Sequence, residues 1–289
     1  MKIASFSGAM INYSMHEAME ITKRAGLDGI EIACREPHLS AETSYERVRE
    51  MKRLAMDLGL QIPALAGYMG NFSTSSDAEC EKAYHEFVHM LEWADLLEAE
   101  LIRIFQGGPN AFLAEAYHYE KAAWWLNRCA IAAKKHDKKI VLEIHNNSLV
   151  ETADTALKLL GMIGQENVGV IHDAANMYIT DTDYGRDSVF KLRGRLFHVH
   201  VKDEMRIDQA GAPGTFVNRT RHGEEHFLQC RLGEGAVDHQ PLLTVLQEIG
   251  YGGWITLECF APYPAEDNLV HDLQAVRSML MNTRKEEIR

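Results

Sequence analysis

The chain has 289 residues, of which 46% are hydrophobic and 25% are charged, and its formal net charge at pH 7 is −12. This composition is typical of a globular protein. The acidic balance argues against a nucleic-acid or anionic-membrane partner, because such partners are bound by basic surfaces. The five cysteines are scattered without a CxxC pair, no apolar run is long enough to span a bilayer, and the amino terminus lacks a signal-peptide pattern. We therefore expect a cytoplasmic protein.

Eight short apolar runs recur along the chain, and their β-branched and aromatic residues favour strands. They are KIASFS from Lys2, GIEIA from Gly29, QIPALAG from Gln61, LIRIFQG from Leu101, KIVLEIH from Lys139, VGVIHDA from Val168, FHVHVKD from Phe197 and WITLECF from Trp254. Amphipathic segments lie between them, and the first begins at the cap-type residue Ser14 and stops at Gly26. The predicted helices cover residues 14–27, 45–60, 83–100, 119–136, 154–164, 186–195, 239–250 and 269–282.

Strands that alternate with helices predict a parallel sheet, which is either doubly wound or closed into a barrel. No GxGxxG follows the first strand, which argues against a dinucleotide-binding sheet. The count of eight favours a single (β/α)8 TIM barrel domain over residues 1–289. The longest irregular segment is the loop at 204–238, after the seventh strand, where barrel active sites lie.

Acidic and imidazole side chains gather at the ends of the last four predicted strands. These residues are Glu143 and His145, then His172 and Asp173, then His198 and His200, and finally Glu258. The carboxyl ends of parallel barrel strands meet at one face, so these side chains are expected to lie together. Two Glu, one Asp and one His form an oxygen-rich set that suits Mn²⁺, Mg²⁺ or Co²⁺, with Zn²⁺ also accommodated. His172 alternates away from Asp173, which favours a core or helix-facing position.

The motifs VLEIHNN, IHDAAN, HVHVKDE, GEG and WITLECF, in this order, resemble the sugar phosphate isomerase/epimerase superfamily with a xylose-isomerase-like TIM barrel. In that superfamily one divalent metal is held by Glu, Asp, His and Glu from the last four strands. The resemblance implies Glu143, Asp173, His200 and Glu258 as the metal ligands here. It also implies a small sugar-like substrate and a homo-oligomer.

The resemblance extends to residues that would contact substrate. Arg103, His145, Lys202 and Arg206 lie at or just beyond predicted strand ends, where cations can hold substrate oxygens. Asn176 stands where many members have a histidine three residues after the ligand aspartate. Glu31 in the second strand and His198 are candidates for an extra contact and for a packed supporting residue, respectively.

Two reactions fit this set of residues. One is isomerisation or epimerisation of a small sugar, in which Glu143 and Glu258 both ligate the metal and move protons. An assignment as a ketose 3-epimerase in particular is weakened, because Leu149 stands where those enzymes tend to carry a second glutamate. The alternative is dehydration of a keto-polyol, keto-cyclitol or 3-dehydroshikimate-like substrate, because Arg103, His145 and Lys202 also resemble such dehydratases.

Other interpretations of the sequence are less favoured. An abasic-site endonuclease is disfavoured by the acidic charge, and a non-catalytic sugar-binding barrel by the complete ligand set. The LGEG sequence from Leu232 is either a turn or a phosphate-binding loop. The HGEEH sequence from His222 does not match HExxH and is expected to be a solvated loop.

Overall fold

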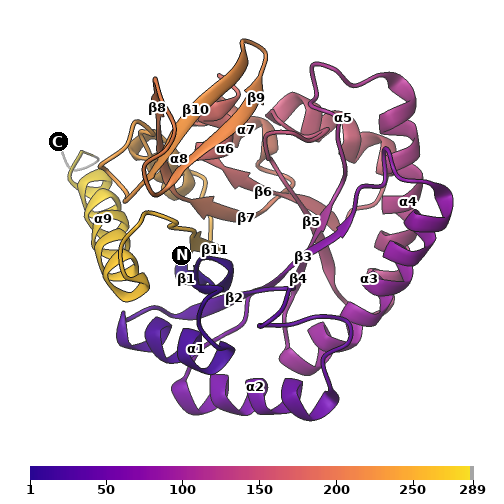
Figure 1. Cartoon of the computed structure of the whole chain (residues 1–289), viewed down its shortest axis with the longest axis horizontal. Coiled ribbons are helices and arrows are strands. Elements are labelled where there is room, and N and C mark those ends of the chain that lie inside the picture. The colour runs from indigo at the N-terminus through magenta and orange to yellow at the C-terminus, as the bar shows by residue number, and fades with distance from the viewer. Residues whose placement is uncertain (287–289) are drawn as a thin grey trace.

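Eight parallel strands close into a barrel in the order β1-β11-β7-β6-β5-β4-β3-β2 (Figure 1). The computed structural model describes residues 1–286, so the last three residues of the expected domain lie outside the described residues. The barrel strands are β1 Lys2–Phe6, β2 Gly29–Ala33, β3 Ala64–Gly70, β4 Leu101–Phe105, β5 Lys139–Glu143, β6 Val168–Asp173, β7 Leu196–Val201 and β11 Trp254–Leu257. The predicted (β/α)8 barrel and all eight of its strands are confirmed.

Helices surround the barrel, as Figure 1 shows. They are α1 Met15–Arg24, α2 Tyr45–Leu58, α3 Asp77–Leu97, α4 Ala116–Lys135, α5 Ala153–Ile163, α6 Ala174–Ile179, α7 Arg186–Leu192, α8 Gln240–Glu248 and α9 Ala265–Glu286, with a 3-10 turn η1 at Ser7–Met10. The eight predicted helices are confirmed, and the short α6 was not expected. Among the described residues, no helix combines the length and apolarity that a membrane crossing requires.

The start of α3 was predicted wrongly, at residue 83 instead of Asp77. Ser76 accepts a hydrogen bond from the backbone N–H of Glu79, whose side chain accepts one from the Ser76 backbone N–H in return. This capping box satisfies N–H groups that the first turn of a helix otherwise leaves unpaired. The polar sequence DAEC therefore begins the helix, although it has few apolar residues.

The described residues form three buried apolar regions, and the two larger ones hold the barrel together. The larger region lies between the strands and the helices, and its largest buried side chains include Trp93, Tyr119 and Phe87. The smaller is a layer made by Ala64, Leu101, Val141 and Ile171, packed against Phe197. Leu101 and Val141 share strand faces with Arg103 and Glu143, since residues two apart point the same way. The layer therefore fills the barrel below the polar side chains at its carboxyl end.

The prediction of an irregular loop at 204–238 was wrong. This segment contains a three-stranded antiparallel sheet (Figure 1). Its strands are β8 Asp203–Ile207, β9 Thr215–Thr220 and β10 Gly223–Cys230, in the order β8-β10-β9. The HGEEH sequence forms the end of the β9–β10 hairpin and the first half of β10, and a positive φ of 110° at Gly223 allows the tight turn. The strands were missed because their residues are mainly polar and lack an apolar alternation.

The LGEG sequence is a turn held by the buried carboxylate of Asp203. Asp203 accepts hydrogen bonds from the backbone N–H groups of Gly233, Gly235 and Val237, at 2.8, 3.0 and 3.0 Å. A side chain at Gly235 would collide with this carboxylate. The N–H groups that a phosphate would use are therefore occupied by the protein itself, which favours the turn interpretation over the phosphate-binding one.

Replacement of Asp203 by alanine is expected to destabilise the protein by about 3 kcal/mol, because it leaves several buried N–H groups without an acceptor. The matched control is Asp208→Ala at the exposed end of the same small sheet, which is expected to change stability by less than about 0.5 kcal/mol. Unfolding by urea, followed by circular dichroism, measures both free energies. Equal losses of unfolding free energy in the two variants would contradict the assignment of Asp203 as the residue that holds the turn.

Candidate metal centre

Four ligand-type side chains converge at the carboxyl end of the barrel. They come from the ends of neighbouring strands: Glu143 from β5, Asp173 from β6, His200 from β7 and Glu258 immediately after β11. One ligand atom of each lies within 4.8 Å of the ligand atoms of the others, and all four residues are buried. The register explains this, because His200 pairs with Asp173 on one side and with Thr256 on the other. We call these four residues the ligand group.

His200 turns one ring nitrogen toward the carboxylates of this group. Its Nδ1 lies 3.6 Å from Oε1 of Glu143 and 3.6 Å from Oε2 of Glu258. Among the described residues this buried nitrogen has no hydrogen-bond partner, and Oδ2 of Asp173 likewise has none apart from its ion pair with Lys202. A nitrogen and several carboxylate oxygens that face one another in this way fit a divalent cation between them, since that donor set suits such ions.

Two buried cations accompany the ligand group. Arg103 Nε lies 2.7 Å from Oε2 of Glu143, and Lys202 Nζ lies 2.9 Å from Oδ2 of Asp173 and 2.8 Å from Oε2 of Glu258. With Glu31 beneath them, four carboxylates face two basic side chains, if the imidazoles are counted as neutral. Two negative charges remain, and one divalent cation balances them.

The pKa shifts follow these contacts. Burial raises the pKa of Glu143, but the Arg103 guanidinium and His200 outweigh it and hold that pKa well below its ordinary value. Burial likewise opposes ionisation of Glu258, yet Lys202 and His200 lower its pKa. For Asp173 burial dominates over Lys202, and its pKa is raised. Glu143 and Glu258 are therefore ionised near neutral pH, as metal ligands must be.

The predicted substrate-binding residues fall into two sets. Arg103, Lys202 and Asn176 contact the ligand group, the last by donating its amide to Oε1 of Glu143 at 3.0 Å. His145 is half-buried beside Glu143, and its Nδ1 lies 2.6 Å from the backbone oxygen of Asn146. Because that oxygen can only accept, Nδ1 carries a hydrogen, and in the neutral ring the lone pair is then on Nε2. All four residues therefore lie beside the ligand group, and their substrate-binding roles stay predictions.

Arg206 is placed apart from the ligand group. Its guanidinium lies 2.7 Å from Oδ1 of Asp181 and 3.1 Å from Oε1 of Glu225, and it donates to the backbone oxygen of Ile179. These contacts tie β8 to the end of α6 and to the hairpin. The structure therefore gives Arg206 a role in holding the small sheet, and its substrate-binding role stays a prediction.

His172 lies outside the ligand group, as predicted. Its Nε2 forms a 2.9 Å hydrogen bond with Ser188 Oγ of α7, on the helix side of the barrel wall. Burial lowers the pKa of His172 to about 4, so the ring is neutral at physiological pH. We therefore assign His172 a packing role between β6 and α7.

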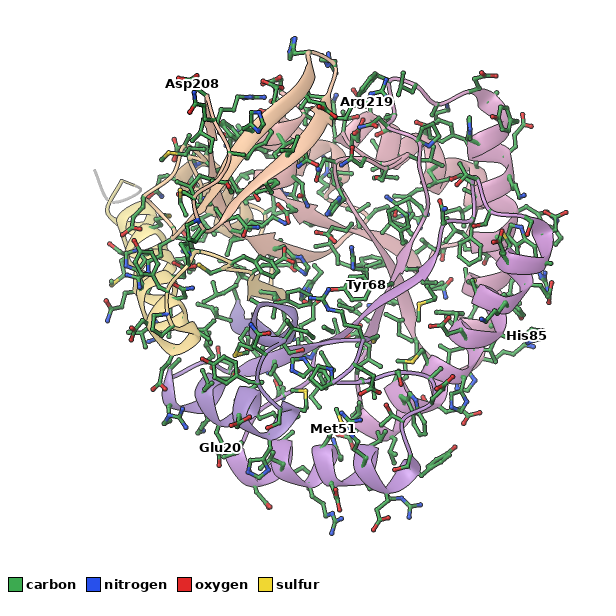
Figure 2. All side chains as sticks on the ribbon, viewed as in Figure 1. Glu20, Met51, Tyr68, His85, Asp208 and Arg219 are labelled. Atoms are coloured by element: carbon green, nitrogen blue, oxygen red, sulfur yellow. The ribbon has the colours of Figure 1, made fainter. Side chains whose placement is uncertain are left out.

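Two further residues near the ligand group were not predicted as site residues. Glu204 is buried, and its Oε2 has no hydrogen-bond partner among the described residues. Burial raises its pKa to about 8, and the charge of Lys202 only partly offsets this effect. Tyr68 of β3 lies near the middle of the view in Figure 2, and its ring centre is 5.2 Å from the Arg103 guanidinium. The alternation of His200, Lys202 and Glu204 in the sequence was the signal that could have identified Glu204, although Glu204 lies in β8 and not in β7.

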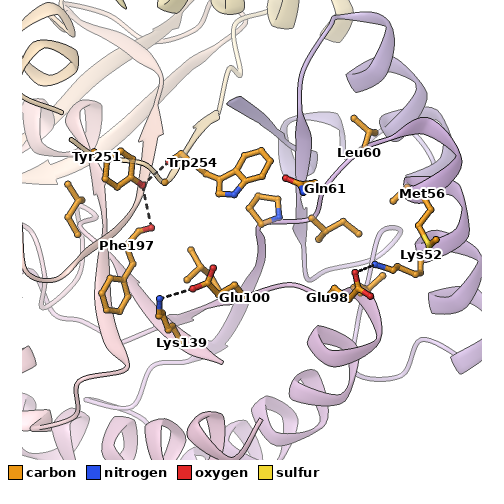
Figure 3. Close-up of a pocket in the computed structure, with 17 residues that line it drawn as sticks. Lys52, Met56, Leu60, Gln61, Glu98, Glu100, Lys139, Phe197, Tyr251 and Trp254 are labelled. Atoms are coloured by element: carbon orange, nitrogen blue, oxygen red, sulfur yellow. Dashed lines mark hydrogen bonds and ion pairs between the residues drawn. The ribbon is translucent and has the colours of Figure 1, made fainter. Parts of the chain in front are cut away.

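A cavity of about 530 Å³ lies at the opposite end of the barrel (Figure 3). Leu101, Lys139, Leu196 and Trp254 line it, and each is the first residue of its strand. Lys139 is paired with Glu100 at 2.7 Å. Because barrel enzymes place their chemistry at the carboxyl ends of the strands, this amino-terminal cavity is separate from the ligand group.

The buried carboxylates and the imidazole lie at the carboxyl end of a (β/α)8 barrel, which is where enzymes of this fold have their active sites. The family model of xylose isomerase-like TIM barrels matches residues 19–279, and the chain belongs to that family. Inosose dehydratase of Clostridium beijerinckii is 26% identical in an alignment of 265 positions that covers 85% of this chain and 82% of that protein.

Two solved structures show the same fold. The probable 3-DHS dehydratase AsbF of Bacillus anthracis has a TM-score of 0.79 at 21% identity and covers 96% of this chain and 99% of its own. An L-ribulose 3-epimerase has a TM-score of 0.79 at 19% identity and covers 99% of this chain and 96% of its own. The relatives are enzymes, and this chain is an enzyme of the same family.

The raised pKa of Glu204 predicts a pH-dependent stability change in the metal-free protein. Its pKa is about 8 in the folded state, against an ordinary value of 4.5 that we assign to the unfolded chain. The unfolded chain therefore ionises first as the pH rises, so this group lowers stability between pH 4.5 and pH 8 and has no such effect below pH 4.5. Glu204→Gln is expected to be more stable than the wild type, and the difference in unfolding free energy should grow across that window by at most about 1.4 kcal/mol per pH unit.

Thermal unfolding in the presence of a chelator, at several pH values from about 5 to about 8, measures this gain. Glu234→Gln, at an exposed position in the neighbouring turn, is the matched control. A gain for Glu204→Gln that is constant across the window would show that Glu204 is already ionised in the folded protein.

Proposed function

We propose that this enzyme is a divalent-metal-dependent dehydratase of a keto-polyol or keto-cyclitol. The proposal rests chiefly on one observation: the groups beside the ligand group are of two unlike kinds. His145 holds its Nδ1 hydrogen on the carbonyl of Asn146, which in the neutral ring leaves the lone pair on Nε2, whereas Lys202 and Glu204 carry protons at neutral pH. An elimination of water needs this asymmetry, because one group must take a proton from carbon while another gives a proton to the leaving hydroxyl.

The ligand group supports the metal dependence. Its donor set of three carboxylates and one imidazole would hold Mn²⁺, Mg²⁺ or Co²⁺, and Zn²⁺ also fits such ligands. When bound, the cation would polarise a substrate carbonyl and stabilise the negative charge that develops on its oxygens. Glu143 and Glu258 suit the role of ligands better than that of bases, because Arg103 and Lys202 lower their basicity.

His145 is our candidate for the base. Its Nδ1 is fixed by the carbonyl of Asn146, and no partner for its Nε2 occurs among the described residues. The ring lies close enough to Glu143 to affect the pKa of that carboxylate. We assign Nε2 the removal of a proton from the carbon next to the keto group, after which the bonding electron pair moves toward the carbonyl oxygen.

Lys202 and Glu204 are our candidates for the acid. Burial lowers the pKa of Lys202, but Asp173 and Glu258 outweigh it and hold that pKa well above its ordinary value, so the amine is charged. As the electron pair returns from the carbonyl oxygen, the carbon–oxygen bond to the β-hydroxyl breaks. The departing oxygen takes a proton from one of these two groups and leaves as water, and the product is an enone.

Isomerisation or epimerisation of a small sugar is the second candidate. It is favoured by the two ionised carboxylates, Glu143 and Glu258, on strands that are not adjacent in the barrel. The fold similarity to L-ribulose 3-epimerase is also in its favour. However, the position of the second glutamate expected in 3-epimerases is taken by Leu149, which is fully buried in the core. That arrangement leaves no carboxylate at Leu149 to contact a sugar.

The two candidates are distinguished by their products. With a chelator-treated and metal-reloaded enzyme, a keto-cyclitol is expected to give a growing ultraviolet enone band, 3-dehydroshikimate is expected to give the band of an aromatic acid, and omission of metal should abolish turnover. In deuterated solvent, an epimerase would instead incorporate deuterium into an inverted or isomerised sugar without any new band. Full turnover by the chelated enzyme would contradict both candidates.

Replacement of His145 by asparagine tests the assignment of the base. We expect turnover to fall by about 100-fold or more, while the affinity for Mn²⁺ stays within a few-fold of the wild type. His118→Asn is the matched control, since His118 caps α4 by accepting from the backbone N–H of Glu115, outside the ligand group. An equal loss of metal binding and turnover in His145→Asn would place His145 among the ligands instead.

A further inference from the structure

One carboxylate oxygen beneath the ligand group accepts from two imidazoles. Oε2 of Glu31 lies 2.9 Å from Nε2 of His198 and 3.0 Å from Nε2 of His200. Glu31 belongs to β2 and both histidines to β7, so these contacts cross the interior of the barrel. The three side chains are at most 1% exposed. Glu31 is therefore not a surface residue that a substrate could reach directly from solvent.

These contacts decide which nitrogen of His200 carries its hydrogen. A carboxylate only accepts hydrogen bonds, so Nε2 of His200 must be the donor. In the neutral form, which a metal ligand must adopt, the imidazole has one N–H, and Nδ1 is then left with its lone pair. That nitrogen is the one that faces Glu143 and Glu258 at 3.6 Å, without a hydrogen-bond partner in the described part of the chain. The tautomer set by Glu31 is the one that a metal ligand requires.

The ring of His200 is also fixed on its faces. Its centre lies 6.1 Å from the ring centre of Phe6 and 5.4 Å from that of His198, which is nearly perpendicular to it. His198 in turn lies 2.8 Å from Thr256 Oγ1, and it gives Oε2 of Glu31 a second donor. Rotation of the Glu31 carboxylate would break both of its hydrogen bonds. His198 thus helps to hold the acceptor in place.

We propose that Glu31 is a positioning residue that holds His200 with Nδ1 directed at the ligand group, and that His198 fixes the Glu31 carboxylate. The inference rests on the proposed metal site and extends it to side chains that do not touch the ion. A carboxylate that accepts from a ligand histidine orients the ring and strengthens its basicity, and its loss typically weakens metal affinity by about 10- to 100-fold.

The same three residues could instead form a second cation site, because their ligand atoms also lie within 4.8 Å of one another. Two observations favour hydrogen bonding. Both nitrogens converge on one oxygen at hydrogen-bond length, while the other oxygen, Oε1, has no hydrogen-bond partner among residues 1–286. A second ion would also have only these three side chains as donors and would need both nitrogens of His200 without hydrogen. The number of ions bound per chain separates the two possibilities.

The experiment measures binding of Co²⁺ and Mn²⁺ to the full-length metal-free protein, by competition with a chelator and by the visible spectrum of Co²⁺. The test variant is Glu31→Gln, which keeps the size of the side chain and removes its charge. We expect one ion per chain in both proteins, an affinity about 10- to 100-fold lower in Glu31→Gln, and an altered Co²⁺ spectrum. His198→Gln is expected to lose affinity as well, to a smaller extent.

The matched control is Glu151→Gln. Glu151 is also a buried carboxylate after β5, but it accepts from Asn110 and from the backbone of Ala111, outside the ligand group. The affinity of the Glu151→Gln protein for both ions should equal that of the wild type. Circular dichroism of each metal-free variant checks folding, and His198→Gln provides the second test if Glu31→Gln does not fold.

Three results would overturn the inference, and they differ from one another. Wild-type affinity and spectrum in the folded variants would show that Glu31 does not position His200. Two ions in the wild type and one in Glu31→Gln would make Glu31 a ligand of a second site. A wild type that binds neither ion would remove the proposed metal-dependent function itself, and this inference with it.

Discussion

The burial of four carboxylates in one small volume is the constraint on which this site depends. Glu31, Glu143, Asp173 and Glu258 are each at most 8% exposed. An ionised carboxylate that leaves water without a partner costs several kcal/mol, so the fold must supply positive charge or hydrogen-bond donors to each of them. Arg103 and Lys202 supply charge from β4 and from the end of β7, and the two histidines supply N–H groups. The remaining negative charge makes the site selective for cations.

The barrel meets this constraint through its register. Closure of eight parallel strands brings every carboxyl end to one rim, and the alternation of side chains directs every second residue inward. The layer of Ala64, Leu101, Val141 and Ile171 fills the interior below, so water is excluded from that side. The charged groups can therefore meet only at the upper level, where substrate would enter. Packing in the lower barrel thus sets the depth of the site.

The sequence was sufficient to predict the eight barrel strands, the helices between them other than α6, and the position of the ligand group, because each depends on local patterns. Glu143, Asp173, His200 and Glu258 lie at the ends of apolar strands, and parallel closure then brings them together. The role of Glu31 was not predictable, since it depends on which side chains meet across the barrel, between β2 and β7. The ion pairs of Arg206 were not predictable for a related reason. Its partners Asp181 and Glu225 come from the end of a short helix and from a polar hairpin, which lack a clear pattern.

The hydrogen bonds of Asp203 also have a mechanical consequence. Lys202 and Glu204 flank Asp203 in the chain, and Asp203 is anchored to the backbone of the turn at Gly233 and Gly235. Lys202 and Glu204 therefore belong to a segment that is held by hydrogen bonds to the loop leading to α8. A displacement of that loop, whether by a ligand or by a neighbouring molecule, would shift Lys202 and Glu204 together. A change in the conformation of this loop would therefore act on the two side chains that we propose as candidate acids.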